Sequence, residues 1–187
     1  LKWLLEAEKR GSIKAEYALG TIKSRCPEIN ISEDKLLNRI VSAAENKYPP
    51  AMYILSTIIG ADPDLGPNDE LVLLREAAEL GDPRAKESYG LRLCFGDNKN
   101  LNPEMGFELI RSAVENGYVP AYFALALCYL NGRGVAQNFK QAVENFETAL
   151  SEGYYLAALA LGELYTDPEF EDFDNKVALA YLQLAQN

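Results

Sequence analysis

An alanine recurs along this 187-residue chain at an almost constant interval. The alanines are Ala15, Ala51, Ala85, Ala121 and Ala157, and successive members are 36, 34, 36 and 36 residues apart. Self-similarity at such a period is the signature of a repeat protein, in which each unit packs only on its neighbours. The interval therefore constrains the fold more strongly than any other feature of the sequence.

Other positions keep the same register. The residues four after each alanine are large, and those five after it are small. The large ones are Leu19, Leu55, Tyr89, Leu125 and Leu161, and the small ones are Gly20, Ser56, Gly90, Ala126 and Gly162. A small side chain lets a second helix approach the backbone closely. The pattern predicts that each small residue is buried where two helices cross.

A glycine stands four residues before most of the alanines, where it would end the preceding helix in the left-handed conformation. These residues are Gly11, Gly81, Gly117 and Gly153, with Lys47 in the second unit. The unit is thus a helix, a turn, a second helix and a stop. The sequence predicts an all-α fold, in which the first unit holds one helix over about 12–25 and a second over about 33–47.

The stretch from residue 121 to 157 is the clearest copy of the unit. Its diagnostic positions are Ala121, Leu125, Tyr129, Gly132, Gly134, Val135, Asn138, Ala142, Ala149 and Gly153. In these positions the chain resembles the Sel1-like repeat, a relative of the tetratricopeptide repeat. The resemblance implies a right-handed α-α superhelix, or solenoid, of about five helix-turn-helix repeats. It is weakest in the turns, where only Gly96 matches the first turn glycine among the other units.

The repeat register divides the chain into a half-unit and five units within a single repeat domain. The half-unit is 1–11, and the units are 12–48, 49–81, 82–117, 118–153 and 154–187. A solenoid normally carries a polar capping repeat at each end. Because neither end has one, we expect the domain to be part of a longer protein.

The charge of the chain restricts its partners. The net charge is −10, and residues 113–187 alone carry 10 acidic and 3 basic side chains. Such a surface repels phosphate backbones and anionic lipid head groups. No apolar run approaches the length of a membrane span. We therefore expect no nucleic-acid binding and no membrane insertion. A protein partner is what the resemblance to the Sel1-like repeat implies.

The residues that usually carry catalysis are scarce. The chain has no histidine, which is the commonest general base and metal ligand. Cys26, Cys94 and Cys128 lack a C-x-x-C spacing and differ in repeat register, so we expect three free thiols. Free thiols favour a reducing compartment such as the cytoplasm over the periplasm. The sequence predicts no enzymatic activity, no metal and no cofactor.

Aromatic residues recur two positions after the alanine, at Tyr17, Tyr53 and Phe123, while Glu87 and Leu159 hold that position in the other units. The resemblance implies that first helices line a concave groove. Aromatic side chains there would anchor a partner's peptide or helix, and packing against the next first helix is the alternative. The candidate groove residues are Tyr17, Tyr53, Glu87, Phe123, Leu91, Leu127 and Arg84, of which Arg84 would bind a carboxylate.

An acidic stretch precedes the last helix and contains Glu169, Phe170, Glu171 and Asp172. Phe173 and Asp174 continue the stretch. Its carboxylates could stabilise the positive end of that helix, with both phenylalanines in the core. Alternatively, the stretch is a contact loop for a basic partner.

The resemblance implies a protein–protein interaction scaffold or adaptor. Two other functions stay open at this point. One is an enzyme of small-molecule or cell-wall chemistry on the same repeat fold, and the other is a structural spacer in a larger protein.

Overall fold

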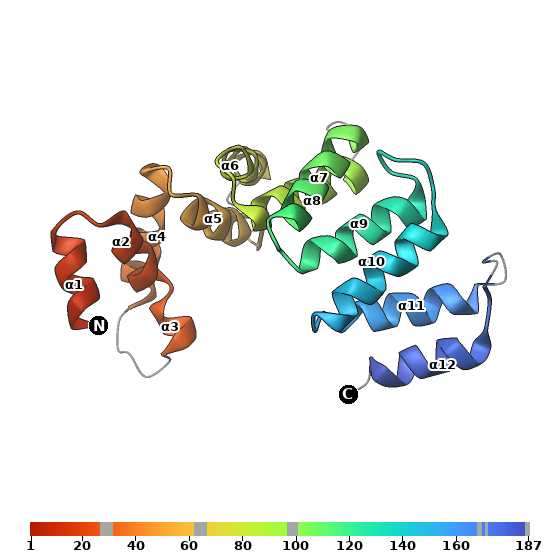
Figure 1. Cartoon of the computed structure of the whole chain (residues 1–187). Helices are drawn as coiled ribbons and strands as arrows, with labels where there is room; N and C mark the ends of the chain where they lie inside the picture. The colour runs from red at the N-terminus through yellow and green to blue at the C-terminus, as the bar shows by residue number, and fades with distance from the viewer. Residues whose placement is uncertain (27–31, 62–66, 97–100, 168–169, 171, 186–187) are drawn as a thin grey trace. The chain divides into compact units, whose positions relative to one another are not determined.

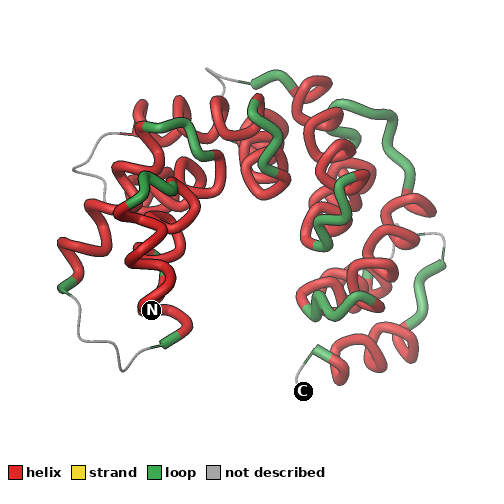
Figure 2. The backbone as a smooth tube through the Cα atoms, turned by 60° about the vertical axis from the view of Figure 1, so that its left-hand side comes forward, coloured by secondary structure: helices red, strands yellow, loops and turns green. Residues whose placement is uncertain are grey.

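The computed structural model describes residues 1–26, 32–61, 67–96, 101–167, 170 and 172–185, which form helices joined by turns and contain no strand (Figures 1 and 2). The helices are α1 (Lys2–Lys9), α2 (Ile13–Gly20), α3 (Ile22–Arg25), α4 (Glu33–Glu45), α5 (Pro49–Ala61), α6 (Pro67–Glu79), α7 (Pro83–Phe95), α8 (Pro103–Glu115), α9 (Pro120–Asn131), α10 (Phe139–Ser151), α11 (Leu156–Thr166) and α12 (Asn175–Leu184). The predicted all-α fold of helix pairs is confirmed. The chain divides into two compact units, Leu1–Lys86 and Glu87–Asn187.

In Leu1–Lys86, α2 packs on α1 and α4, and α5 packs on α4 and α6. Leu19, Ile22 and Leu36 form a buried cluster at the first of these junctions. The expected single helix over 12–25 is wrong, because the chain breaks it at Thr21. The Thr21 hydroxyl donates to the Tyr17 carbonyl oxygen at 3.1 Å. A hydroxyl that bonds a carbonyl of the preceding turn bends a helix.

In Glu87–Asn187, each helix from α8 to α11 packs on the next one along the chain. Two buried clusters alternate along this row. One lies among α7, α8 and α9 and includes Cys94, Ile110 and Cys128. The other lies among α9, α10 and α11 and is centred on Phe146, whose ring has no exposed surface. Each first helix therefore completes the core of the pair before it.

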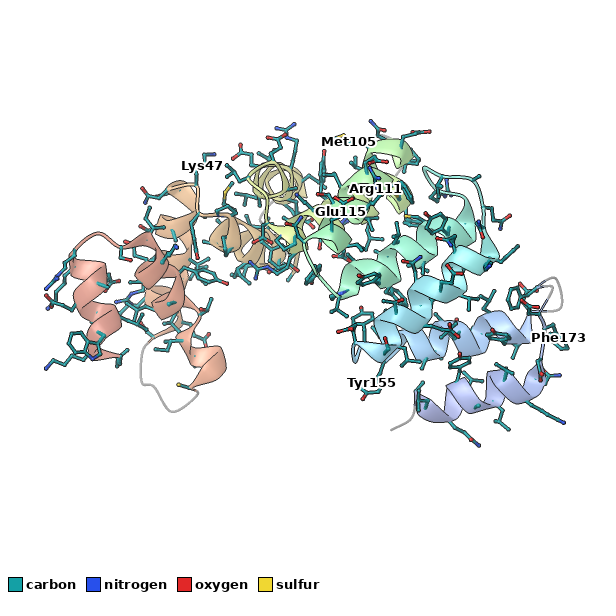
Figure 3. The ribbon with its side chains drawn as sticks, viewed as in Figure 1. Lys47, Met105, Arg111, Glu115, Tyr155 and Phe173 are labelled. Carbon is teal, nitrogen blue, oxygen red and sulfur yellow. The ribbon has the colours of Figure 1, made fainter. Side chains whose placement is uncertain are left out.

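The predicted helix stops adopt the left-handed conformation. The φ angles are +79° at Gly11, +95° at Gly81, +74° at Gly117 and +89° at Gly153. Lys47 takes the same conformation, with φ +57°, although it carries a side chain (Figure 3). A non-glycine residue pays a steric cost there, since its Cβ approaches the following carbonyl oxygen. The repeat register thus imposes the stop even where glycine is missing.

The small residues five after each alanine are buried, which confirms the predicted helix crossings. They are Gly20, Ser56, Gly90, Ala126 and Gly162. At Gly90 a Cβ atom would lie 2.8 Å from the Gly106 carbonyl oxygen on α8. The two backbones therefore meet without an intervening side chain.

Candidate interaction surface

The aromatic residues of the candidate groove in Leu1–Lys86 are half-buried, and each has a partner 31 residues further along the chain. The rings of Tyr17 and Tyr48 meet edge to face at 5.3 Å between centroids. The guanidinium of Arg84 lies 4.7 Å from the centre of the Tyr53 ring. Tyr48 directly precedes the next first helix, α5, and Arg84 lies on the following one, α7. Both contacts are close to the alternative interpretation, in which the aromatic side chain packs against the adjacent first helix.

Arg84 is held by a buried carboxylate of its own chain. Its Nε donates to Asp82 Oδ1 at 3.1 Å, and its second terminal nitrogen donates to Asp82 Oδ2 at 2.7 Å. Asp82 is only 6% exposed and also accepts a backbone N–H bond from Ala85 at the start of α7. Hydrogen bonding to Asp82 raises the pKa of Arg84. The charge expected to bind a ligand carboxylate is therefore already paired.

In Glu87–Asn187, Phe123 contacts two rings of neighbouring elements. Its ring centroid lies 5.3 Å from that of Phe146 on α10 and 5.4 Å from that of Tyr154, just before α11. Leu91 and Leu127 are half-buried and pack against the two core clusters of this unit. These three residues therefore contribute to the core while part of each side chain stays at the surface.

Glu87, another candidate groove residue, is a partly buried carboxylate. Burial raises its pKa, and the Ser88 hydroxyl, which donates to Glu87 Oε2 at 3.0 Å, opposes that rise. Burial also raises the pKa of Tyr154, and the nearby charge of Glu87 adds to it. A poorly solvated carboxylate, that of Glu87, therefore lies near the aromatic ring of Tyr154, which contacts Phe123.

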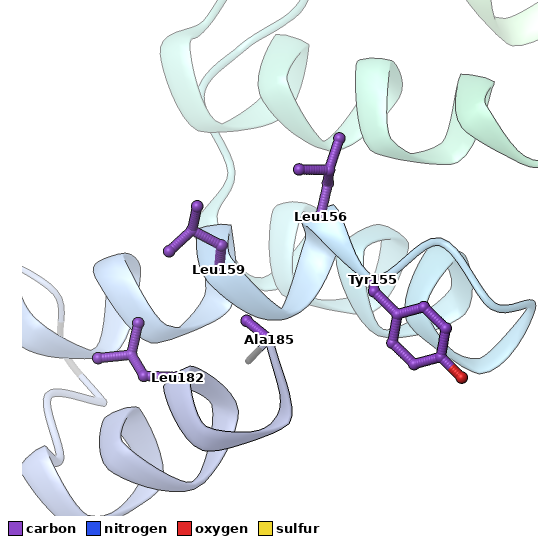
Figure 4. Close-up of a pocket in the computed structure, with 5 residues that line it drawn as sticks. All are labelled: Tyr155, Leu156, Leu159, Leu182 and Ala185. Atoms are coloured by element: carbon purple, nitrogen blue, oxygen red, sulfur yellow. The ribbon is translucent and has the colours of Figure 1, made fainter. Parts of the chain in front are cut away.

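An apolar pocket of about 390 Å³ lies between α11 and α12 (Figure 4). Its lining residues are Tyr155, Leu156, Leu159, Leu182 and Ala185. Tyr155, Leu156 and Leu159 are 63%, 57% and 43% exposed. Burying such side chains is normally favourable by 1–3 kcal/mol each, at about 25 cal/mol per Å². The pocket therefore offers a partner a favourable contact.

Sequence reasoning found only one residue of this pocket, Leu159 in the row of candidate groove positions. The signal for the rest is the register of the second helices. Leu182 corresponds to Ile110 and Phe146, and both of these are fully buried under the next first helix. Leu182 is only half-buried in the structure, and Leu156 and Leu159 beside it are exposed.

The acidic stretch before α12 is only partly described. Phe170 is 5% exposed and packs on Tyr165 and Phe139, with ring centroids 5.2 and 5.8 Å away. Asp172 is exposed, and Asp174 caps α12 through backbone N–H groups. Glu169 and Glu171 lie outside the described residues. The buried Phe170 and the capping carboxylate of Asp174 agree with the first interpretation of this stretch. Phe173, which that interpretation also placed in the core, is instead 44% exposed.

Two general features of the described residues bear on function. They contain no group of three or more cysteine, aspartate and glutamate side chains arranged to hold a metal ion. Among them, no helix combines the length and apolar character that crossing a bilayer needs.

Comparison with known proteins identifies the repeat. The model of the Sel1 repeat matches residues 83–118 and 119–154, which confirms the resemblance. A Sel1 repeat protein from Oxalobacter formigenes has a TM-score of 0.79 and 20% identity, over 99% of this chain and 77% of that one. No curated protein gives a significant match.

Two further solved structures share the fold. A protective antigen of uropathogenic Escherichia coli strains, described as having an SLR fold, has a TM-score of 0.78 and 20% identity, over 99% of this chain and 40% of that one. The immunity protein PA5088 from Pseudomonas aeruginosa has a TM-score of 0.65 and 25% identity, over 98% of this chain and 70% of that one.

Proposed function

We propose that this chain, with its two Sel1 repeats, is a protein-interaction module. It would bind an amphipathic helix or peptide of a partner on the side of Glu87–Asn187 formed by the first helices α7, α9 and α11, which we call the first-helix face. One observation carries the proposal: the exposed apolar side chains that line the pocket between α11 and α12. Contiguous apolar surface of this kind marks interaction sites on soluble proteins. Protein interaction is also the typical role of the Sel1 repeat.

The pocket would hold the apolar anchors of the partner. Leu156 and Leu159 are three residues apart on α11, so they lie on one face of the helix. A partner helix would place its own leucine or aromatic side chains between them and Leu182. Anchors in such pockets provide most of the energy of a helix-in-groove interface.

Charge supports a basic partner. Residues 87–187 carry 14 acidic and 6 basic side chains. A field of one sign attracts a partner of the opposite sign and raises the association rate. Glu87, half-buried on the first-helix face, would accept hydrogen bonds from a lysine or arginine. The partner segment would then be amphipathic, with apolar anchors on one face and basic residues beside them.

A binding role is favoured over a catalytic one by the chemistry of the side chains. The sequence has no histidine to act as a base. Among the described residues, the pocket is lined by four apolar side chains and one tyrosine, with no carboxylate or thiol. Such a lining can bind a side chain but offers no group for proton transfer at neutral pH.

The test uses a purified partner and two sets of variants. The double substitution Leu156→Ala with Leu159→Ala should weaken binding by about tenfold or more, because hot-spot truncations cost about 2 kcal/mol. Met105→Ala is the matched control, since Met105 on α8 is as exposed as Leu159, at 43% (Figure 3). Both proteins should keep their helical circular dichroism.

Two results would overturn the proposal. One is unchanged affinity in the pocket variant together with loss of binding when the acidic stretch is replaced. The other is full biological activity of the pocket variant in the intact protein, which would favour a structural spacer. Phe123→Ala is a poorer probe, because Phe123 also packs on Phe146 and its truncation would loosen the core.

A further inference from the structure

Two thiols meet in the core of Glu87–Asn187. Cys94 lies on α7 and Cys128 on α9, 34 residues later, and neither has any exposed surface. The Cys128 thiol donates a hydrogen bond to Cys94 Sγ, with 3.7 Å between the sulfurs. The contact joins the first helices of the two Sel1 repeats at 83–118 and 119–154.

The surroundings hold the sulfurs in place. A Cβ atom on Gly106 would lie 2.6 Å from Cys94 Sγ, so the absent side chain at Gly106 provides the space for that sulfur. The Cys94 thiol also donates to the Pro103 carbonyl oxygen at 3.5 Å. Because a disulfide needs the sulfurs about 2.05 Å apart, the pair requires an approach of under about 2 Å.

The two thiols differ in acidity. The hydrogen bond from Cys128 lowers the pKa of Cys94, and the positive charge of Arg133 lowers it further. Burial alone would raise this pKa, but the two lowering effects outweigh it. The same hydrogen bond and burial raise the pKa of Cys128. Since the thiolate is the nucleophilic form, Cys94 is the more nucleophilic of the two sulfurs. Because it is buried, an oxidant reaches it when the surrounding helices open locally.

We propose that Cys94 and Cys128 are an oxidisable dithiol, which hydrogen peroxide converts into a disulfide between α7 and α9. The Cys94 thiolate attacks one peroxide oxygen, so that an S–O bond forms, the O–O bond breaks and hydroxide leaves. The Cys128 sulfur then attacks the Cys94 sulfenic acid, and the S–S bond forms as water departs with the Cys128 proton. The two thiols lose two electrons, and peroxide is reduced to water.

The experiment counts thiols after controlled oxidation. The reduced protein, unfolded without reductant, should titrate with three thiols. After treatment of the folded protein with peroxide and removal of the excess with catalase, it should titrate with one, that of Cys26. The intact mass should fall by two hydrogens, and digestion should yield a single peptide pair linking Cys94 to Cys128. Dithiothreitol should restore all three thiols.

Variants separate this pair from the third cysteine. Cys26→Ser should still form the Cys94–Cys128 link and leave no free thiol. Cys128→Ser should instead accumulate sulfenic acid at Cys94, which a dimedone label detects. Three results overturn the proposal: three thiols that persist through oxidation, a mapped disulfide that contains Cys26, or over-oxidation of Cys94 with Cys128 still free. Because mapping uses the unaltered chain, the test does not depend on the folding of any variant.

Discussion

Replacing Gly90 with alanine should destabilise Glu87–Asn187, because the added methyl group has no space. A Cβ atom there would lie 2.7 Å from Ile110 Cγ1 and 2.8 Å from the Gly106 carbonyl oxygen. Ile110 is fully buried, and the oxygen belongs to the backbone of α8. Neither neighbour can yield without moving one helix relative to the other.

The magnitude follows from two opposing effects. Overpacking a core costs about 1–3 kcal/mol, and a contact with backbone belongs at the upper end of that range. Alanine is favoured over glycine inside a helix by about 1 kcal/mol. The free energy of unfolding should therefore fall by about 2 kcal/mol in Gly90→Ala, from the difference of these two effects.

Gly162→Ala is the matched control at the same register. Its Cβ atom would lie 2.6 and 2.7 Å from the Leu182 Cγ and Cδ2 atoms, while the nearest backbone oxygen, that of Ala178, is 3.4 Å away. Leu182 is only half-buried, so its side chain can rotate outward. The cost and the gain in helix propensity should cancel to within about 0.5 kcal/mol.

Urea unfolding followed by far-UV circular dichroism distinguishes the two variants. We expect a clear loss of stability in Gly90→Ala and a midpoint near that of the unaltered protein in Gly162→Ala. Equal midpoints for the two variants would refute the argument from backbone contact. A Gly90→Ala protein as stable as the original would refute the close helix crossing itself.

Three further predictions concern strain and pH. Lys47→Gly should stabilise Leu1–Lys86 by about 1 kcal/mol, because glycine relieves the steric cost of the positive φ angle. Lys47→Ala should give no such gain, and loss of the exposed ion pair between Lys47 and Glu76 should matter little in either variant. Urea midpoints of the two variants provide the check. Burial raises the pKa of Glu87 in the folded protein above its ordinary value of 4.5. The folded state is therefore favoured by the protonated carboxyl group below pH 4.5, and this stability is lost as the pH rises through the higher pKa of the folded state. Glu87→Gln should therefore be more stable than the original at neutral pH but not below pH 4.5, and equal midpoints at neutral pH would contradict this. Burial and a hydrogen bond to Glu147 raise the pKa of Tyr181 from 10.0 to about 12. The stability that Tyr181 contributes is therefore present below pH 10.0 and is lost as the pH rises from 10.0 to about 12. Urea midpoints measured across this pH range should fall less steeply for Tyr181→Phe than for the original protein.

The features that sequence predicted well are those fixed by local sterics. A helix can end in the left-handed conformation only at certain positions, so the stops at Gly81 and Gly117 follow from their spacing. A close helix crossing needs a small residue, so Gly90 and Gly162 are recognisable in the same way. The break at Thr21 was missed because a threonine inside a helix has two hydrogen-bonding choices that spacing does not distinguish.

The features that sequence missed depend on contacts between helices of neighbouring repeats. Cys94 stands nine residues after its alanine and Cys128 seven after its own, so the register gives no sign that their sulfurs touch. The contact appears only when α7 and α9 pack around one buried cluster, in which both cysteines lie. The pocket was missed for a similar reason, since Leu182 looks like a buried position until the elements around it are known.

The contact between Arg84 and Tyr53 explains the one short interval in the repeat. Counted from the alanine, Asp82 stands where Tyr48, Tyr118 and Tyr154 stand in other units. Counted from the preceding aromatic residue, however, Arg84 takes the place of the tyrosine, 31 positions after Tyr53. A guanidinium over a ring can replace a second ring, but a charge buried there needs a counterion. Asp82 supplies it through its ion pair with Arg84. The 34-residue interval and this ion pair therefore belong together, because they place Arg84 where a tyrosine contacts the aromatic residue elsewhere in the chain.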